Sequence, residues 1–202
     1  MRHRGLLVLS LLLPVLASGL GCGHSHLRYD YASEPDPRKQ EYVIGPSDVL
    51  KISVWHNADL SVDTTVRPDG TITLPLIGDI RAAGRTSEQI RVELTQRLGA
   101  FIKDESAIAT VAVTGINSYR FTVSGNVEHQ GTFTSNHYVT VLEAITLAGG
   151  PNRFAAPEDT ILTRTEGKRG RRRIPIDYPD LVNGTRPEED LPLISGDTIY
   201  VP

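Results

Sequence analysis

The chain has 202 residues, of which 39% are hydrophobic and 22% are charged, so it has enough apolar material to build a core. A formal net charge of −3 gives no general reason to expect a nucleic-acid partner. The single cysteine excludes an internal disulfide and any metal site built from several thiolates.

The N-terminal segment has the features of an export signal. Arg2 and Arg4 precede the uncharged residues 6–20, and Cys22, the only cysteine, follows. So short a run is not expected to cross a hydrocarbon layer of roughly 30 Å. The segment resembles a bacterial lipoprotein signal, so we expect removal of residues 1–21 and lipidation of Cys22. The alternatives are ordinary signal cleavage, which leaves a free thiol, and a buried core helix.

A polar stretch follows this signal. Residues 22–41 include Pro35 and Pro37 and few aliphatic side chains, so we expect a lipidated tether between the membrane and the folded chain. His24 and His26 could bind a metal ion as a pair, but we interpret them as part of a solvated linker.

Short strands open the first expected domain, residues 42–115. Residues 50–55 alternate apolar and polar side chains, as a half-buried strand does. The pattern of residues 62–75 predicts a hairpin. Its turn, residues 67–70, has a proline to preset φ and a glycine to supply a positive φ. Residues 76–80 add a further short strand.

One helix and one strand complete this domain. Thr86 and Gln89 have the spacing of a capping box at the start of the helix. Four apolar side chains recur near helical spacing and are expected to face the sheet: Ile90, Leu94, Leu98 and Phe101. Residues 108–113 then alternate as a closing strand.

The second expected domain, residues 116–202, again combines strands with one helix. Strands are predicted at residues 119–123, from Thr132 onward, and at residues 160–165, 173–177 and 198–201. Thr140 and Glu143 form a second possible capping box. The apolar face of this short helix is expected to be Val141, Leu142, Ile145 and Leu147. Both domains indicate an α+β fold class.

Several segments carry a resemblance to two known domains. The first domain resembles the polysaccharide export domain at residues 42–54 and 67–80, continuing to residues 83–86. The second resembles the soluble-ligand-binding β-grasp (SLBB) domain at residues 121–127, 140–145, 148–150 and 192–202. The resemblance covers residues 42–202. It implies a small export domain followed by a β-grasp domain.

The resemblance implies a role like that of the Wza-type outer-membrane polysaccharide export lipoproteins. Such proteins form homo-oligomeric rings in the periplasm, pass capsule or exopolysaccharide through a central channel, and perform no catalysis. An inner-membrane polysaccharide co-polymerase is the implied partner, with the polysaccharide in transit as cargo. The implied location is the periplasm, with the N-terminal lipid in the outer membrane.

The resemblance is incomplete at the C-terminal end. Full-length members of the family have a second β-grasp repeat and a membrane-crossing amphipathic helix, whereas this chain stops at Pro202, after the first repeat. We therefore expect a separate outer-membrane channel, for which a β-barrel is a candidate. The alternative function is a monomeric periplasmic module that binds a glycan or small ligand.

The family-motif residues are expected to be structural. They are Gly45, Pro46, Asp48, Asp69, Gly70, Gly78, Gly125, Gly149 and Gly150. Their residue types suit turns, local caps and close backbone approach. Asp48 and Asp69 could suggest a glycosidase pair, but nothing in their spacing supports one. We expect no catalytic residue, no cofactor and no metal ion.

Two features remain as candidate contacts with polymer or partners. Trp55 could stack on a sugar ring, although burial in the core or in a subunit contact is the favoured interpretation. The basic run consists of Lys168, Arg169, Arg171, Arg172 and Arg173. The favoured interpretation is a solvated hairpin tip. The alternative is contact with an anionic polymer, a neighbouring copy or a partner, with residues 188–190 as the acidic complement.

Overall fold

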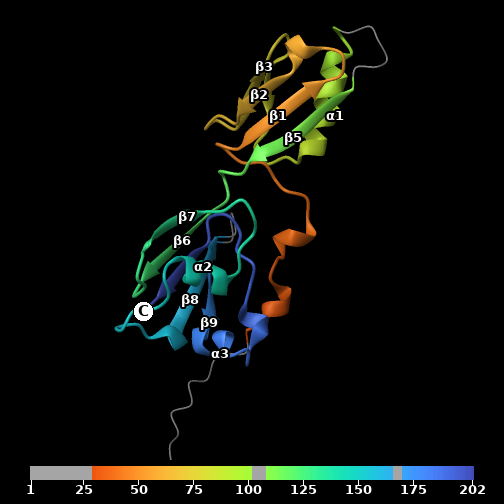
Figure 1. The fold of residues 1–202 in the computed structure, drawn as a ribbon. Coiled ribbons are helices and arrows are strands. Elements are labelled where there is room, and N and C mark those ends of the chain that lie inside the picture. The colour runs from red at the N-terminus through yellow and green to blue at the C-terminus, as the bar shows by residue number, and fades with distance from the viewer. Residues whose placement is uncertain (1–28, 102–107, 166–169) are drawn as a thin grey trace, which may run out of the picture.

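The computed structural model describes residues 29–101, 108–165 and 170–202 (Figure 1). The expected signal segment lies outside these ranges, as do five of the residues singled out above: Cys22, His24, His26, Lys168 and Arg169. Among the described residues, no helix has the length and apolarity that crossing a bilayer requires.

Among the described residues, five strands and one α-helix form the first part of the fold. They are β1 (Val49–Val54), β2 (Val62–Thr65), β3 (Thr71–Leu74), β4 (Gly78–Arg81), α1 (Ser87–Leu98) and β5 (Ala109–Gly115). Strand β1 lies between β2 and β5 and is antiparallel to both. Strands β3 and β4 form a separate two-stranded antiparallel sheet.

The hairpin predicted over residues 62–75 is wrong. Its turn is present, because the amide of Gly70 donates a hydrogen bond to the carbonyl of Arg67 at 2.8 Å. The two arms, however, pair with other strands: β2 pairs with β1, and β3 pairs with β4. Strand β3 buries Ile72 and Leu74, whereas β2 has no fully buried residue. Packing against β1 and β4 thus decides how the two arms pair, although the arms are adjacent in the sequence.

Helix α1 begins where it was predicted to begin and ends earlier than predicted. Thr86 and Gln89 form the capping box, which is confirmed. Three members of the predicted apolar face are buried: Ile90, Leu94 and Leu98. The fourth, Phe101, is 59% exposed, so its prediction is wrong. The helix ends at Leu98, so Phe101 lies beyond it, in a turn.

Among the described residues, five strands and two α-helices form the second part. They are β6 (Arg120–Gly125), β7 (Gly131–Thr134), α2 (Val141–Leu147), β8 (Thr160–Thr165), β9 (Arg171–Ile176), α3 (Tyr178–Val182) and β10 (Thr198–Val201). The strand order is β7-β6-β10-β8-β9, with β10 parallel to β6 and the other pairs antiparallel. The α+β fold class is confirmed, but the prediction of one helix in this part is wrong, because α3 is a second one.

Helix α2 covers one face of this sheet (Figure 1). The predicted capping box of Thr140 and Glu143 is confirmed. Val141 and Ile145 are buried as expected, but Leu147 is 53% exposed, so its prediction is wrong. Ala144 and Ala148 are buried instead, because the small side chains let the last turn lie close to the sheet.

Residues 29–41, here called the strap, run along the second part before the chain enters the first (Figure 1). The rings of Tyr29 and Tyr31 pack against the core of the second part. The hydroxyl of Tyr31 donates a hydrogen bond to the carbonyl of Pro175 on β9 at 2.8 Å. The side chain of Glu34 is 1% exposed. This portion of the expected tether is therefore packed on the fold.

Candidate functional site

The carboxylate of Asp48 joins the two parts of the fold. Asp48 lies just before β1 and is fully buried. Its Oδ2 accepts hydrogen bonds from the Tyr42 hydroxyl at 2.7 Å, the Gly45 amide at 2.8 Å and the Ser118 hydroxyl at 2.9 Å. Its Oδ1 accepts from the amides of Asn117 and Ser118, both at 2.8 Å. Both oxygens hold the connection between β5 and β6, which leaves neither free for proton transfer.

The residues around Asp48 support this connection between the two parts. A Cβ on Gly45 would stand 2.4 Å from the Cβ of Ser118, so the close approach requires glycine. Pro46 and Ser47 complete the turn, and Ser47 has a positive φ of 76°. Burial raises the pKa of Tyr42, and its hydrogen bond to Asp48 adds to the rise. The phenol therefore stays protonated and donates to the carboxylate.

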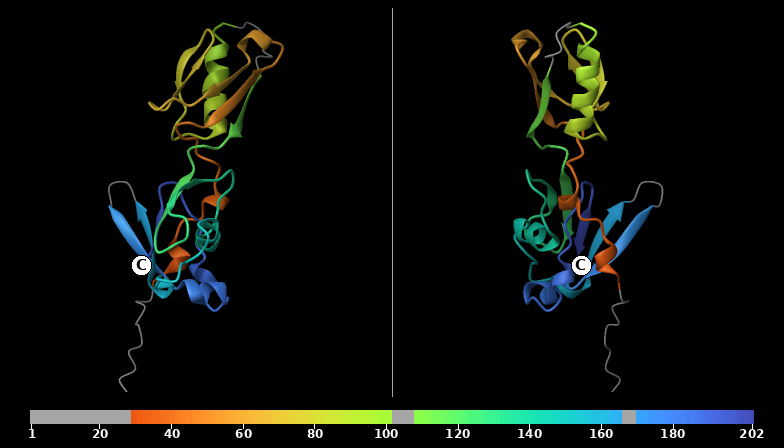
Figure 2. Two further views of the ribbon diagram at one scale, coloured as in Figure 1. Left: turned by 60° about the vertical axis from the view of Figure 1, so that its left-hand side comes forward. Right: turned by 90° about the vertical axis from the view of Figure 1, so that its right-hand side faces the viewer.

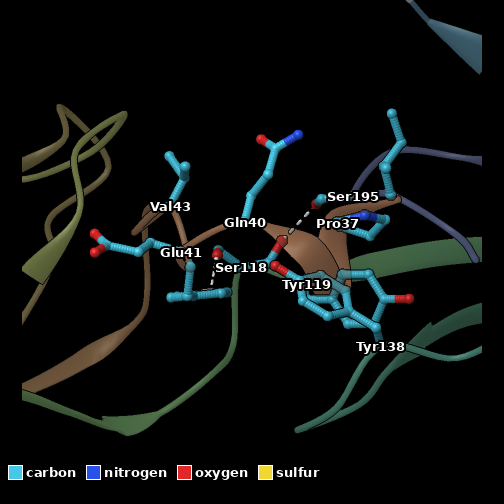
Figure 3. Close-up of a pocket in the computed structure, with 10 residues that line it drawn as sticks. Pro37, Gln40, Glu41, Val43, Ser118, Tyr119, Tyr138 and Ser195 are labelled. Atoms are coloured by element: carbon cyan, nitrogen blue, oxygen red, sulfur yellow. Dashed lines mark hydrogen bonds between the residues drawn. The ribbon is translucent and has the colours of Figure 1, made fainter. Parts of the chain in front are cut away.

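A hollow of about 200 Å³ lies beside this joint (Figure 3). The rings of Tyr119 and Tyr138 meet edge to face, with centroids 5.2 Å apart. The Tyr119 hydroxyl accepts from the Val139 amide at 3.1 Å and donates to the Leu193 carbonyl at 3.3 Å. The hollow is lined by Pro37, Gln40, Glu41, Tyr42, Val43, Ser118, Tyr119, Tyr138, Ile194 and Ser195.

The lining of this hollow suits a small polar ligand with an apolar face. Aromatic rings supply flat apolar contacts, while Gln40 and Glu41 supply polar groups. The hydroxyl of Ser195 donates to the carbonyl of Ser118 at 2.7 Å, so it serves the wall of the hollow rather than acting as a nucleophile. Among the described residues, no cluster of His, Cys, Asp and Glu is arranged to hold a metal ion.

A buried ionic cluster ties the strap to the second sheet. Arg164 on β8 is fully buried and donates to Asp197 at 2.7 Å, to the Pro192 carbonyl at 2.9 Å and to Glu34 at 2.9 Å. Arg172 on β9 also donates to Glu34, at 3.1 Å. Burial alone would lower the pKa of Arg164, but the two carboxylates raise it. The guanidinium therefore stays charged, and Glu34 anchors the strap.

The basic run divides between two environments. Arg171, Arg172 and Arg173 lie on strand β9 rather than at a hairpin tip. Arg172 pairs with Glu34 of its own chain, whereas Arg171 and Arg173 are exposed. The remaining members, Lys168 and Arg169, lie outside the described residues.

The acidic residues 188–190 are largely engaged within their own chain. Glu189 is 1% exposed, accepts from Arg186 at 3.0 Å and accepts from the Asp177 amide at 2.6 Å. Asp190 accepts a hydrogen bond from the Leu142 amide at 3.0 Å. These contacts make the run a poor acidic complement for a neighbouring copy, and they stabilise the region before β10 instead.

Trp55 follows β1 at the far end of the first part and is 60% exposed. Its ring stacks on His56, with centroids 4.8 Å apart and planes 23° apart. His56 has a positive φ of 58°, which turns the chain back beside Trp55. Ile108 and Thr110 line the adjacent shallow hollow. The structure thus places Trp55 on the surface, at the opposite end of β1 from Asp48.

The remaining motif residues of the first part form a turn. The Asp69 carboxylate accepts from the amide and hydroxyl of Thr71, at 3.0 and 2.6 Å, and these bonds lower the pKa of Asp69. Gly70 has a φ of 82°, and a Cβ there would stand 2.8 Å from the Cβ of Ala83. Gly78 has a φ of 77° at the start of β4.

The three motif glycines of the second part also have positive φ. Gly125 ends β6, and a Cβ there would stand 2.0 Å from the Val201 carbonyl oxygen. Gly149 and Gly150 follow α2, both with a φ of 83°. A Cβ on Gly149 would stand 2.9 Å from the Cβ of Glu128. Each lies apart from Asp48 and from the hollow, so the motif residues do not converge on one site.

Two sets of residues in these sites were not predicted from the sequence. Tyr119 and Tyr138 come together with Tyr42 only through the fold, and no local spacing indicates their meeting. Arg164 did leave a signal, because it occupies the inward position two residues after Leu162 in an alternating strand. A charge at a core position predicts a buried partner, although it does not say which one.

Two family models match the chain. The polysaccharide biosynthesis/export protein model matches residues 36–114, and the SLBB domain model matches residues 120–177. The first match includes part of the strap and the first part as far as residue 114, within β5. The matches meet near Asn117 and Ser118, which bind the carboxylate of Asp48.

Curated relatives were also found. "Exopolysaccharide production protein ExoF" of Rhizobium meliloti (strain 1021) is 32% identical over 130 residues, which is 57% of this chain and 30% of that protein. "EPS I polysaccharide export outer membrane protein EpsA" of Ralstonia solanacearum is 29% identical over 151 residues, which is 63% of this chain and 40% of that protein. A protein of the same name from Ralstonia nicotianae (strain ATCC BAA-1114 / GMI1000) is 28% identical. The chain thus covers well under half the length of these relatives.

Proposed function

We propose that this chain is a member of the polysaccharide biosynthesis/export family and a non-enzymatic component of a polysaccharide export machinery at the outer membrane. The observation that carries the proposal is the ordered pair of family matches, each of which falls on a separate packed core. The relatives named as export proteins support the same cargo class.

The finer parts of the proposal concern anchoring and assembly. We propose a signal peptide at residues 1–21, a lipid on Cys22 and a periplasmic location for the folded domains. We place the export domain at residues 42–115 and the SLBB domain at residues 116–202. Several copies would form a ring around the polymer, because two domains this small cannot enclose a polysaccharide chain alone. An inner-membrane co-polymerase and a separate outer-membrane channel are the proposed partners.

The hollow beside Asp48 favours a second candidate function. Its aromatic and polar lining would suit a monomeric module that binds a glycan or a small ligand. The two candidates differ in assembly, since the export component acts as a ring and the binding module as a single copy. The mass of the purified full chain in detergent distinguishes them. A large closed oligomer supports the ring, and a monomer supports the binding module.

Deletion of the gene tests the proposed export role directly. We expect the deletion strain to lose surface polysaccharide, measured by compositional analysis, and plasmid-borne wild-type chain to restore it. Normal surface polysaccharide in the deletion strain, in the absence of a compensating paralogue, contradicts the export role. A matched strain carrying the empty plasmid controls for the effect of the vector.

A further inference from the structure

The five-stranded sheet has one uncovered face. Helices α2 and α3 lie on one side of this sheet, and the right-hand view of Figure 2 shows no described helix on the other side. Cross-strand pairing defines two rows of side chains on that side. The first row is Thr132, Thr122, Thr198, Thr163 and Arg173. The second row is Ser124, Tyr200, Ile161 and Pro175.

We call these two rows the open face. Directly opposite residues in paired strands point to the same side of a sheet, and none of the residues in the two rows is buried. The intervening residues on the same strands, such as Val123, Ile199 and Leu162, are fully buried on the helix side. The open face spans all five strands, a width of roughly 19 Å at the usual spacing between strands.

Hydroxyl groups dominate the open face. The Thr122 and Thr132 hydroxyls lie 3.2 Å apart and pair with each other. The hydroxyls of Thr163 and Thr198 make no hydrogen bond to any other described residue, so they are available to a ligand. Tyr200, in the middle strand, is 46% exposed and adds an aromatic surface. Hydroxyls beside an exposed ring match the polar edges and apolar faces of sugar rings.

The charge on and around the open face is positive. Arg173 ends the first row, and Arg171 and Arg120 extend a third row with Thr165 and Thr134. Arg171 and Arg173 form no ion pair with any described residue. No acidic residue occurs in the three rows, although the whole chain has a net charge of −3. The face therefore complements a negatively charged ligand.

This chemistry distinguishes a polymer from a second copy of the chain. Protein interfaces have an apolar centre with charged residues depleted, whereas the centre of this face is a row of threonines. We propose that the open face binds an acidic polysaccharide chain laid across the strands, a proposal that rests on the export function proposed above. Arginine guanidinium groups bind the carboxylates, threonine hydroxyls bind the sugar hydroxyls, and Tyr200 stacks on a ring.

Binding of defined oligosaccharides to the full chain tests this assignment. The probes are oligogalacturonate, which is acidic, and a neutral malto-oligosaccharide of equal length, titrated calorimetrically. We expect tighter binding of the acidic probe, with an affinity that falls as salt rises. The double variant Arg171→Gln/Arg173→Gln is expected to bind it roughly tenfold more weakly. Tyr200→Ala is expected to weaken binding through loss of stacking, with circular dichroism showing that it is folded.

Lys51→Gln is the matched control, because it removes one exposed positive charge from the other part of the fold. Its affinity for oligogalacturonate is expected to equal that of the wild type. Unchanged affinity in both test variants, or equal affinity for the neutral probe, overturns the proposal. A lower oligomer mass with unchanged probe affinity also overturns it, since the face would then belong to a neighbouring copy.

Export in cells distinguishes failure of this inference from failure of the proposed function. Wild-type chain and the Arg171→Gln/Arg173→Gln variant are each returned to the deletion strain, and surface polysaccharide is measured. Reduced export with the variant supports the open face as the polymer contact. Full export with the variant, where the deletion abolishes export, overturns this inference alone. Normal export in the deletion strain itself overturns the proposed function.

Discussion

At the scale of single residues, Asp48 shows how a buried carboxylate is stabilised. A buried charge is costly unless its oxygens accept hydrogen bonds, and the Asp48 carboxylate accepts five. The donors come from the segment before β1 and from the segment after β5. One side chain thus connects backbone separated by about 70 residues. The role of Asp48 is therefore structural: its carboxylate binds these five donors and does not transfer protons.

Asp48→Asn is expected to destabilise the protein strongly. The amide group that replaces Oδ1 or Oδ2 would place its own N–H against backbone donors and leave them unpaired. We expect a loss of about 3 kcal/mol in the free energy of unfolding, measured by urea denaturation. Asp63→Asn, on the exposed side of β2, is the control and should change stability by less than about 0.5 kcal/mol. Equal small effects of both variants would refute the structural role of Asp48.

At the scale of elements, helix α1 is held at its start and along one face. The capping box fixes its start, and the buried side chains of the apolar face hold it against the sheet. On the outer face, Glu93 pairs with Arg85 and with Arg97, the latter at 2.6 Å. The hydrogen bond from Arg85 is the main cause of the lowered pKa of Glu93, and the charge of Arg97 contributes.

The lowered pKa of Glu93 predicts an acid-dependent contribution to stability. A carboxyl with a lower pKa in the folded state stabilises the fold above its unfolded pKa of about 4.5. That contribution is lost as the pH falls through the folded pKa. Glu93→Gln should therefore be about 1 kcal/mol less stable than the wild type at pH 7, and the difference should shrink at pH 3. Urea denaturation at the two pH values measures this, and a constant difference would contradict it.

At the scale of the whole molecule, the chain crosses between its two parts more than once. The strap lies on the second part, residues 42–115 form the first part, and the chain then returns to the second. Glu34 and Arg164 pair across 130 residues of sequence. The position of the strap is thereby set by the second sheet.

Glu34→Ala is expected to release the strap while both cores remain folded. Removal of this carboxylate leaves the buried Arg164 with Asp197 as its remaining charged partner, at a cost of about 2 kcal/mol. We expect faster amide hydrogen exchange in residues 29–41, measured by mass spectrometry. Asp30→Ala, on an exposed residue of the strap, is the control and should leave exchange unchanged. Equal protection in Glu34→Ala and the wild type would show that the tyrosines alone hold the strap.

Local patterns predicted the starts of α1 and α2, but not that of α3, and most of the strands. A capping box needs only residues three positions apart, so Thr86 with Gln89 and Thr140 with Glu143 are readable from the sequence. Helix ends were harder to predict. Phe101 and Leu147, near the two helix ends, were therefore assigned to the apolar faces although both are exposed. The pairing of β2 and β3 could not be deduced from their turn, because the partners that bury each strand lie elsewhere in the chain.

The sequence by itself determined the fold class, the order of the two matched domains and the turn residues, because these depend on short spacings and on ordered motifs. Only the tertiary structure decided which residues share a site. The partners of Asp48, the ion pairs of Arg164 and the threonine row of the open face come from distant segments. Their meeting depends on strand order and register, which are set by burial across the whole domain rather than by neighbours in the chain.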